Sequence, residues 1–189
     1  MVETGSAVTR LSVGDEVYGG LGLHMGAYGE YVAVPEDASI ITKPANMSFA
    51  EAAAVPLGGL NALHFLRLVG LRRGESVLVN GAGGSIGLHG VQIAKAMGAE
   101  VTGVCSTRNV ELVRSLGADE VIDYKQTDYT QSGRQWDVIV DNVGNHSADE
   151  VLATGSAAWG RGAARGGQRV HGSPQPLDRR RQRDADHRR

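Results

Sequence analysis

From residue 76 onward the apolar residues gather in four short runs, which alternate with segments of helical spacing. The runs are "SVLVN" at 76–80, "VTGVC" at 101–105, "EVIDY" at 120–124 and "DVIVD" at 137–141. Strands that are apolar on both faces and alternate with helices are typical of a parallel sheet that helices cover on each side. Because parallel connections are right-handed, few other topologies remain. The pattern therefore predicts the α/β class, with a parallel sheet of about four strands.

Ahead of that sheet, the first 47 residues predict short β segments. "GDEVYG" (14–19) and "GEYVAVP" (29–35) alternate apolar and polar residues and are bounded by Gly or Pro. This period of two is typical of half-buried strands. We therefore expect one strand in each of the two segments.

A helix is predicted next, in two pieces. Ser48 and Glu51 have the spacing of a capping box, in which each side chain bonds the other residue's amide, so a helix begins there. Pro56 and the glycines after it predict an interruption. Helical spacing resumes over 60–70, with leucines on one face from Leu60 onward.

Four glycines follow the first predicted strand of the sheet, where the next helix begins, in "VLVNGAGGSIGL". Three of them, Gly81, Gly84 and Gly87, lie three residues apart. Backbone without Cβ lets a pyrophosphate approach closely, and the free amides and positive dipole of a helix N-terminus hold it. Ser85 and Ile86 would offer those amides. The alternative is a glycine-rich turn that merely packs tightly; the surrounding strand–helix alternation favours the nucleotide site.

The end of the second predicted strand bears on which dinucleotide binds. NAD-selective sites usually place Asp or Glu there, about 20 residues beyond the glycines, to hold the ribose 2′-hydroxyl. This chain instead has "CSTRN", with Ser106, Thr107 and Arg108. Hydroxyls and a guanidinium suit a 2′-phosphate, because Arg binds phosphate through paired hydrogen bonds. We therefore expect NADP(H) as the cofactor, the alternative being that Arg108 is only a solvated residue at a helix start.

Charge divides the chain in two. Residues 1–150 carry 10 Lys and Arg against 18 Asp and Glu, whereas residues 151–189 carry 9 Arg against 3 Asp. Such a break in composition usually marks a boundary. We considered two interpretations of the Arg/Gly-rich tail: a basic arm for an anionic partner, and a non-native reading frame, which we favour. Nucleic acid is thus not an expected partner, and disorder is expected from about residue 155 because few apolar residues remain.

Five blocks along residues 1–150 together resemble one family. They are "VGDEVYG", "GAYGEYVAVP", "AEAAAVPLGGLNAL", "VLVNGAGGSIGLHGVQIAKAMGAEVTGVCSTRNVELVRSLGADEVIDY" and "DVIVDNVGNHS". In this order they resemble the medium-chain dehydrogenase/reductase superfamily, and within it the zinc-independent quinone oxidoreductase branch. The resemblance implies part of a β-rich GroES-like catalytic domain over 1–47, a Rossmann NADP-binding domain with a bridging helix over 48–154, and a tail over 155–189.

The resemblance assigns roles to residues of the glycine turn and of the second strand's end. Ala82, Gly84 and Gly87 match the family's A-x-x-G-x-x-G turn over the pyrophosphate. Ser106 and Arg108 fall where the branch holds the 2′-phosphate. Both assignments agree with the chemistry of the residues.

The resemblance also reaches residues outside those two stretches. Tyr124 falls on the tyrosine beside the 2′-phosphate, and Asn142 and Val143 match the strand end that borders the cofactor ribose. Asn61 sits where the family commonly has Thr near the nicotinamide, a departure that weakens its assignment. The family's first strands are expected to lie before Met1. The family is usually homodimeric, but the edge that builds its dimer is expected to be missing here.

The activity implied by the resemblance is hydride transfer from NADPH to a small-molecule quinone or α,β-unsaturated carbonyl, without zinc and with no acid or base that we can name. The linker "GLGLHM" lacks the four-cysteine lobe of zinc-dependent relatives, and the six histidines show no ligand spacing, so no metal is expected. Two alternatives stay open: a relative of zinc-dependent alcohol dehydrogenases, and a truncated, non-catalytic chain that only binds cofactor.

We expect a cytoplasmic protein with no membrane segment. The chain has a single cysteine, its N-terminus lacks a secretory pattern, and it contains no apolar run of about 18 residues.

Overall fold

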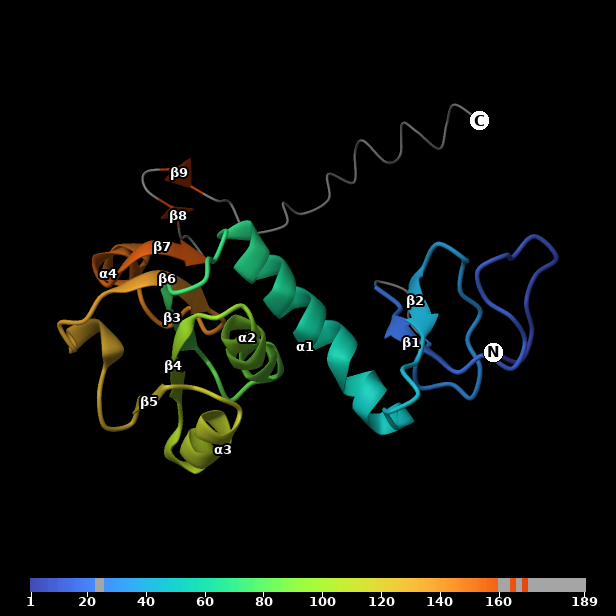
Figure 1. Ribbon diagram of the computed structural model, residues 1–189, viewed down its shortest axis with the longest axis horizontal. Helices are drawn as coiled ribbons and strands as arrows, with labels where there is room; N and C mark the ends of the chain where they lie inside the picture. The colour runs from blue at the N-terminus through green and yellow to red at the C-terminus, as the bar shows by residue number, and fades with distance from the viewer. Residues whose placement is uncertain (23–25, 160–163, 166–167, 170–189) are drawn as a thin grey trace.

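A parallel sheet organises the computed structural model, which describes residues 1–22, 26–159, 164–165 and 168–169 (Figure 1). Its parallel strands are β3 (Ser76–Asn80), β4 (Glu100–Cys105), β5 (Glu120–Asp123), β6 (Trp136–Asp141) and β7 (Gly155–Trp159). They lie in the order β5-β4-β3-β6-β7, and the short antiparallel strands β8 (Ala164–Arg165) and β9 (Gln168–Arg169) extend that edge. The α/β class and the Rossmann-type sheet predicted from the apolar runs are confirmed.

Two hydrophobic clusters cover the two faces of the sheet, because alternate residues of each strand point to opposite sides. On β3, Val77 and Val79 enter one cluster and Leu78 enters the other. The first cluster is completed by residues of helices α1 (Phe49–Leu68), α2 (Ser85–Ala96) and α3 (Val110–Ser115). The second is completed by residues of η2 (Tyr129–Gln131) and α4 (Ala148–Ala153). Both faces of the central strands are therefore buried, as the continuous apolar runs required.

Helix α1 is continuous through Pro56, so the predicted interruption is wrong. Its capping box forms as expected, with Ser48 and Glu51 each bonding the other's amide. Pro56 is buried, and the two glycines after it face α2, where a Cβ on Gly58 would lie 2.5 Å from Ser85 Oγ. Tight packing of this face against α2 offsets the hydrogen bond that proline removes from the helix. The predicted leucine face is wrong in part, because Leu60 is 57% exposed.

The N-terminal region forms one antiparallel pair, β1 (Val17–Gly20) with β2 (Ser39–Thr42). The first predicted β segment overlaps β1, but the second, 29–35, contains no strand among the described residues. Burial explains the difference: Ile40 in β2 is 7% exposed, whereas Tyr31 is 74% exposed. Helix α1 extends from this pair to the parallel sheet (Figure 1).

The expectation of disorder from residue 155 is wrong for residues 155–159, which form β7. The backbone of β7 pairs in parallel with β6, with Gly155 beside Trp136. Gly155 fits because a Cβ there would lie 2.7 Å from Ile139 Cδ1. Main-chain pairing and a close backbone approach let a strand form here from a segment without β-branched residues. The remainder of the tail, apart from β8 and β9, lies outside the described residues.

Thr102 of β4 and Trp136 of β6 form a buried hydrogen bond across the strand β3 that lies between them, with Trp136 Nε1 donating to Thr102 Oγ1 at 3.1 Å. We expect Thr102→Val to lower the free energy of unfolding by about 1–3 kcal/mol, because it leaves the indole N–H buried without an acceptor. In a Trp136→Phe background, which has no indole N–H, the same change should cost much less. Urea unfolding of the four proteins measures this; equal costs in both backgrounds would contradict the interaction.

No helix in the part of the chain that the structure describes has the length and apolar character of a membrane span.

Candidate functional site

The glycine turn lies at the carboxyl end of β3, where the strand order reverses between β3 and β6. Ligands of open α/β sheets bind in the crevice outside the strand ends at such a reversal. The amides of Gly81 and Ala82 donate to the carbonyl of Val104 at 3.1 and 2.9 Å, which anchors the turn to β4. Gly81 has a φ of +79°, a conformation that side chains other than glycine's disfavour.

The turn and α2 approach each other so closely that Gly87 has no room for a side chain. A Cβ on Gly87 would overlap the carbonyl oxygen of Gly81 and lie 2.7 Å from Ala82 Cα. A Cβ on Gly81 would lie 2.8 Å from Val143 Cγ2, on the loop after β6. The glycines therefore serve both close packing and an open backbone, and the two interpretations of the sequence are not exclusive.

The N-terminus of α2 presents backbone donors without acceptors. Gly84 is the N-cap and supplies no side-chain cap, and the first amide to bond back is that of Leu88, to Gly84 O at 2.8 Å. The amides of Ser85, Ile86 and Gly87 have no acceptor within the described residues. Gly84 and Ser85 are exposed. Together with the dipole of a 12-residue helix, this geometry is suited to an anion.

At the end of β4, Ser106 is half-buried and Arg108 is exposed. The guanidinium of Arg108 has no ion-pair partner among the described residues. Thr107, in contrast, donates its hydroxyl to Asp123 Oδ2 at 2.6 Å, and this bond is the main reason that the pKa of Asp123 is lowered. Of the two hydroxyls expected from the sequence to face a ligand, only that of Ser106 remains available, because Thr107 donates its hydroxyl to Asp123.

A polar network joins the ends of β3 and β6. Asp141 is 7% exposed, and its Oδ1 accepts from Asn80 Nδ2 at 2.9 Å and from the amides of Val143 and Gly144 at 3.0 Å. Asn142 Nδ2 donates to Asn80 O at 3.1 Å, whereas Asn142 Oδ1 is buried without a partner in the described part of the chain. Asn80 and Asp141 were missed from the sequence, although a polar residue that ends an apolar strand is a usable signal.

A cavity of about 450 Å³ opens between these strand ends. Its lining residues are Asn80, Gly81, Val104, Tyr124, Thr127, Asp128, Tyr129, Val143, Asn145 and His146. Gly81, Tyr124 and Val143 were predicted, and the structure brings these three together. The others were missed; only Asn145 and His146, which directly follow "DNVG", could have been suspected from the sequence.

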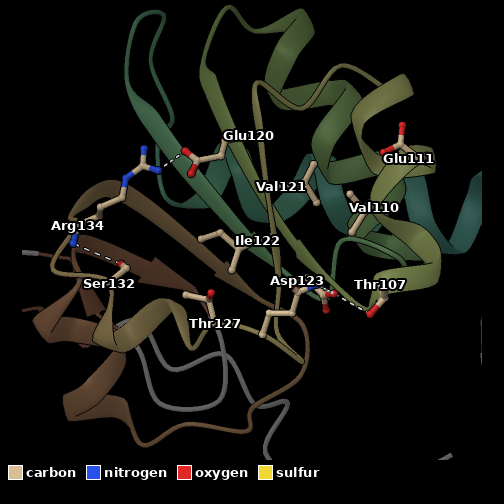
Figure 2. Close-up of a pocket in the computed structure, with 11 residues that line it drawn as sticks. Thr107, Val110, Glu111, Glu120, Val121, Ile122, Asp123, Thr127, Ser132 and Arg134 are labelled. Atoms are coloured by element: carbon tan, nitrogen blue, oxygen red, sulfur yellow. Dashed lines mark hydrogen bonds and ion pairs between the residues drawn. The ribbon is translucent and has the colours of Figure 1, made fainter.

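A second cavity, of about 540 Å³, lies beside the edge strand β5 (Figure 2). The charged side chains on its walls already have partners within the chain: Arg134 pairs with Glu120, and Asp123 accepts from the hydroxyl of Thr107. It includes no residue of the glycine turn. We therefore place the candidate site at the smaller cavity, which the turn adjoins.

Asn61 is separate from the other predicted residues. Its Nδ2 donates to Leu57 O, one helical turn back, at 2.7 Å, and it lines neither of these two cavities. Cys105 is buried at the end of β4, and burial, with a smaller contribution from Asp123, raises the pKa of its thiol. Among the described residues no group of three or more His, Cys, Asp and Glu side chains could hold a metal ion.

A Rossmann-type sheet with a glycine turn, free helix amides and a cavity at the point of strand reversal is typical of dinucleotide-binding folds. Residues 85–178 match the family model described as zinc-binding dehydrogenase. The chain belongs to the medium-chain dehydrogenase/reductase superfamily and is similar to its quinone oxidoreductases. The resemblance inferred from the five sequence blocks is confirmed.

Two curated relatives illustrate the similarity. The chain is 39% identical to the chloroplast envelope quinone oxidoreductase homolog of Arabidopsis thaliana, over 74% of this chain and 46% of that protein. It is also 39% identical to the 2-methylene-furan-3-one reductase of Solanum lycopersicum, over 83% of this chain and 43% of that protein. The chain thus spans less than half the length of these relatives.

Solved structures agree with the sequence comparison. The quinone oxidoreductase of Pseudomonas syringae pv. tomato has a TM-score of 0.72 and 34% identity, over 81% of this chain and 49% of that one. The quinone oxidoreductase of Thermus thermophilus, solved also in complex with NADPH, has a TM-score of 0.59 and 33% identity, over 67% and 43% of the two chains.

Proposed function

We propose that the protein binds NADP(H) across the glycine turn and acts in hydride transfer to a quinone or an α,β-unsaturated carbonyl. The observation that carries the proposal is the set of three free amides, of Ser85, Ile86 and Gly87, at the N-terminus of α2. The glycines of the turn have no side chains that would cover the N-terminus of α2. This N-terminus lies beside the carboxyl ends of the parallel strands. A quinone oxidoreductase relative solved with NADPH supports the choice of cofactor.

In this proposal the phosphates are held by main chain. The pyrophosphate lies over Gly81, Ala82 and Gly84, where the amides of Ser85 and Ile86 donate to it. Gly87 adds its free amide, and its lack of a side chain allows the helix to approach the turn. Helix dipole and backbone donors are already oriented, so binding costs no rearrangement of side chains.

The adenosine ribose is assigned to the end of β4. Arg108, which has no ion-pair partner among the described side chains, pairs with a 2′-phosphate, and Ser106 donates its hydroxyl to the same group. Tyr124, 57% exposed, flanks that phosphate. This arrangement favours NADP(H) over NAD(H), because no carboxylate at 106–108 is available for a free 2′-hydroxyl.

The nicotinamide ribose is assigned to the end of β6. Asn142 Oδ1 is a buried acceptor without a partner in the described chain, which suits a ribose hydroxyl donor, and Val143 borders it. Asn61 remains a proposed neighbour of the nicotinamide, on the resemblance alone.

When bound, the cofactor supplies the hydride, and the protein orients it. No side chain of this chain is assigned as acid or base. The proposed reaction does not use zinc. Hydrogen bonds stabilise the oxygen of the quinone or enone that accepts the hydride. The partner proposed is a small quinone or enone molecule. The cytoplasmic location stays a prediction from the sequence, and the Arabidopsis relative carries the chloroplast envelope in its name.

Fluorescence titration with NADPH and NADH tests the binding step, and NADPH oxidation with a panel of quinones and enones tests the activity. We expect saturable binding with NADPH preferred. Binding without oxidation would restrict the chain to cofactor binding, and the lack of saturable NADPH binding would overturn the proposed function.

A further inference from the structure

The turn that carries Arg108 is short and has little support of its own. It is η1 (Thr107–Asn109), a 3₁₀ helix of three residues between the end of β4 and the start of α3. Ser106, the residue before it, makes no side-chain cap within the described chain, and the turn is closed by bonds from the amides of Asn109 and Val110. A 3₁₀ turn of this length is weak by itself. The direction in which Arg108 points therefore depends on what the neighbouring side chains contact.

The first residue of η1 is bonded to the neighbouring strand. Thr107 Oγ1 donates to Asp123 Oδ2 at 2.6 Å, which links the segment after β4 to the last residue of β5 (Figure 2). The Oδ1 atom of Asp123 accepts from the amide of Lys125 at 3.0 Å, and its Oδ2 also accepts from Gln126 Nε2 at 2.9 Å. Two other donors thus hold the carboxylate in place for the bond to Thr107.

The last residue of η1 lies against the glycine turn. A Cβ on Gly83 would overlap Asn109 Nδ2 and lie 3.0 Å from Asn109 Cγ, so the amide side chain packs directly on the backbone of Gly83. Arg108 therefore stands between two residues with separate anchors, Thr107 on β5 and Asn109 on the glycine turn. A guanidinium held in this way loses less freedom on binding a phosphate, so more of the interaction appears as affinity.

The bond between Thr107 and Asp123 also joins the two strand ends that the proposed 2′-phosphate site uses. Cys105 and Asp123 are paired in the register of β4 and β5, and the amide of Tyr124 donates to Cys105 O at 3.1 Å. Arg108 follows β4 and Tyr124 follows β5. One hydrogen bond thus connects the segments that supply the guanidinium and the tyrosine.

We propose, on the basis of the function proposed above, that Asp123 is a positioning residue of the 2′-phosphate site. Its carboxylate holds the Thr107 hydroxyl, and this bond fixes η1 in the conformation from which Arg108 meets the phosphate. Without the bond only a fraction of the molecules presents Arg108 correctly, and the apparent dissociation constant rises by the inverse of that fraction. NADH has no 2′-phosphate, so its affinity does not depend on the bond.

Fluorescence titration of the full chain with NADPH and with NADH tests this inference in two variants of Thr107. Thr107→Val removes the hydroxyl and keeps the branched shape. We expect it to weaken NADPH binding about fivefold, as when one molecule in about five keeps η1 in place, and to change NADH binding by less than about twofold. Thr107→Ser keeps the hydroxyl and should retain the wild-type affinity for both cofactors.

Two double variants show whether the effect depends on Asp123 and acts through Arg108. Asp123→Ala should weaken NADPH binding by about fivefold or more, and Thr107→Val should add less than about twofold in that background, because the bond is already lost. In an Arg108→Ala background Thr107→Val should likewise add less than about twofold, because the side chain that the bond positions is absent.

Ser76→Ala is the matched control, since it removes another hydroxyl that donates to a carboxylate, that of Asp137, at 2.8 Å. Ser76 is the first residue of β3 and lies at the amino ends of the parallel strands, away from the glycine turn. Both cofactor affinities should stay as in wild type. Thermal unfolding without ligand checks that the variants are folded, and Thr107→Ala, which also lacks the hydroxyl, serves if Thr107→Val is unstable.

An unchanged NADPH affinity in Thr107→Val, or equal losses of NADPH and NADH affinity, would overturn the inference and leave the proposed function standing. A loss in Thr107→Ser as large as that in Thr107→Val would also overturn it, because the hydroxyl would then not matter. If wild type shows no saturable NADPH binding, the proposed function itself fails.

Discussion

Replacing Gly87 with alanine should destabilise the fold by about 3 kcal/mol or more and abolish NADPH binding. The added methyl group would overlap the carbonyl oxygen of Gly81 and lie 2.7 Å from Ala82 Cα. Both are backbone atoms of a turn that the Val104 carbonyl anchors, so neither can move aside without breaking that anchor. Helix α2 would have to withdraw from the turn and carry its free amides with it.

Gly90→Ala provides the matched control for this result. It lies in the same helix and is buried as well, but a Cβ there would meet Val79 Cγ1 at an ordinary 3.7 Å. The higher helix propensity of alanine should raise the free energy of unfolding by up to about 1 kcal/mol. Urea unfolding and NADPH titration measure both variants. If Gly87→Ala were as stable as Gly90→Ala and still bound NADPH, the close approach of α2 to the turn would be incorrect.

Replacing Arg108 with alanine should weaken NADPH binding by roughly 10- to 100-fold and leave NADH binding unchanged. The guanidinium is exposed and has no ion-pair partner among the described residues, so its removal breaks no internal ion pair there. The loss should therefore appear in the dissociation constant for the phosphorylated cofactor and not in protein stability. Titration with both cofactors, together with thermal unfolding, separates the two effects.

Arg114→Ala is the charge control, because Arg114 is an exposed residue of the following helix, α3, where it pairs with Glu111. Its loss should change NADPH binding by less than about twofold, since exposed ion pairs contribute little. Parallel losses of NADPH and NADH affinity in Arg108→Ala would show that Arg108 does not read the 2′-phosphate. A loss in Arg114→Ala as large as that in Arg108→Ala would indicate a general effect of charge.

The sheet could be predicted because strands buried on both faces leave a plain record of apolar residues in the sequence. The N-terminal region was harder, since the alternating pattern around Tyr31 resembles a strand although that side chain stays largely exposed. The interruption predicted at Pro56 was wrong because local propensity favours a break in the helix there, whereas packing against α2 keeps the helix continuous. The strand β7 was missed because its stability comes from backbone pairing with β6, which side-chain patterns do not record.

The phosphate part of the site could be inferred from the sequence because glycines and a following helix make a local motif. The cavity could not, because its residues come from separate loops and strand ends. Asp128 and Tyr129 precede or begin a three-residue helix, and their sequence neighbours carry no motif. The hydrogen bond that uses the Thr107 hydroxyl could not be predicted either. Its acceptor, Asp123, is 16 residues away in the chain, and no periodicity links the two residues.

The side-chain link between Asn80 and Asp141 has a consequence for biosynthesis. These residues are 61 positions apart, and their strands become neighbours only when the later one docks beside the earlier one. A nascent polypeptide that has emerged past the glycine turn therefore still lacks the far wall of the pocket. If the protein binds a nucleotide as proposed, the complete pocket for it therefore exists only once β6 has paired with β3.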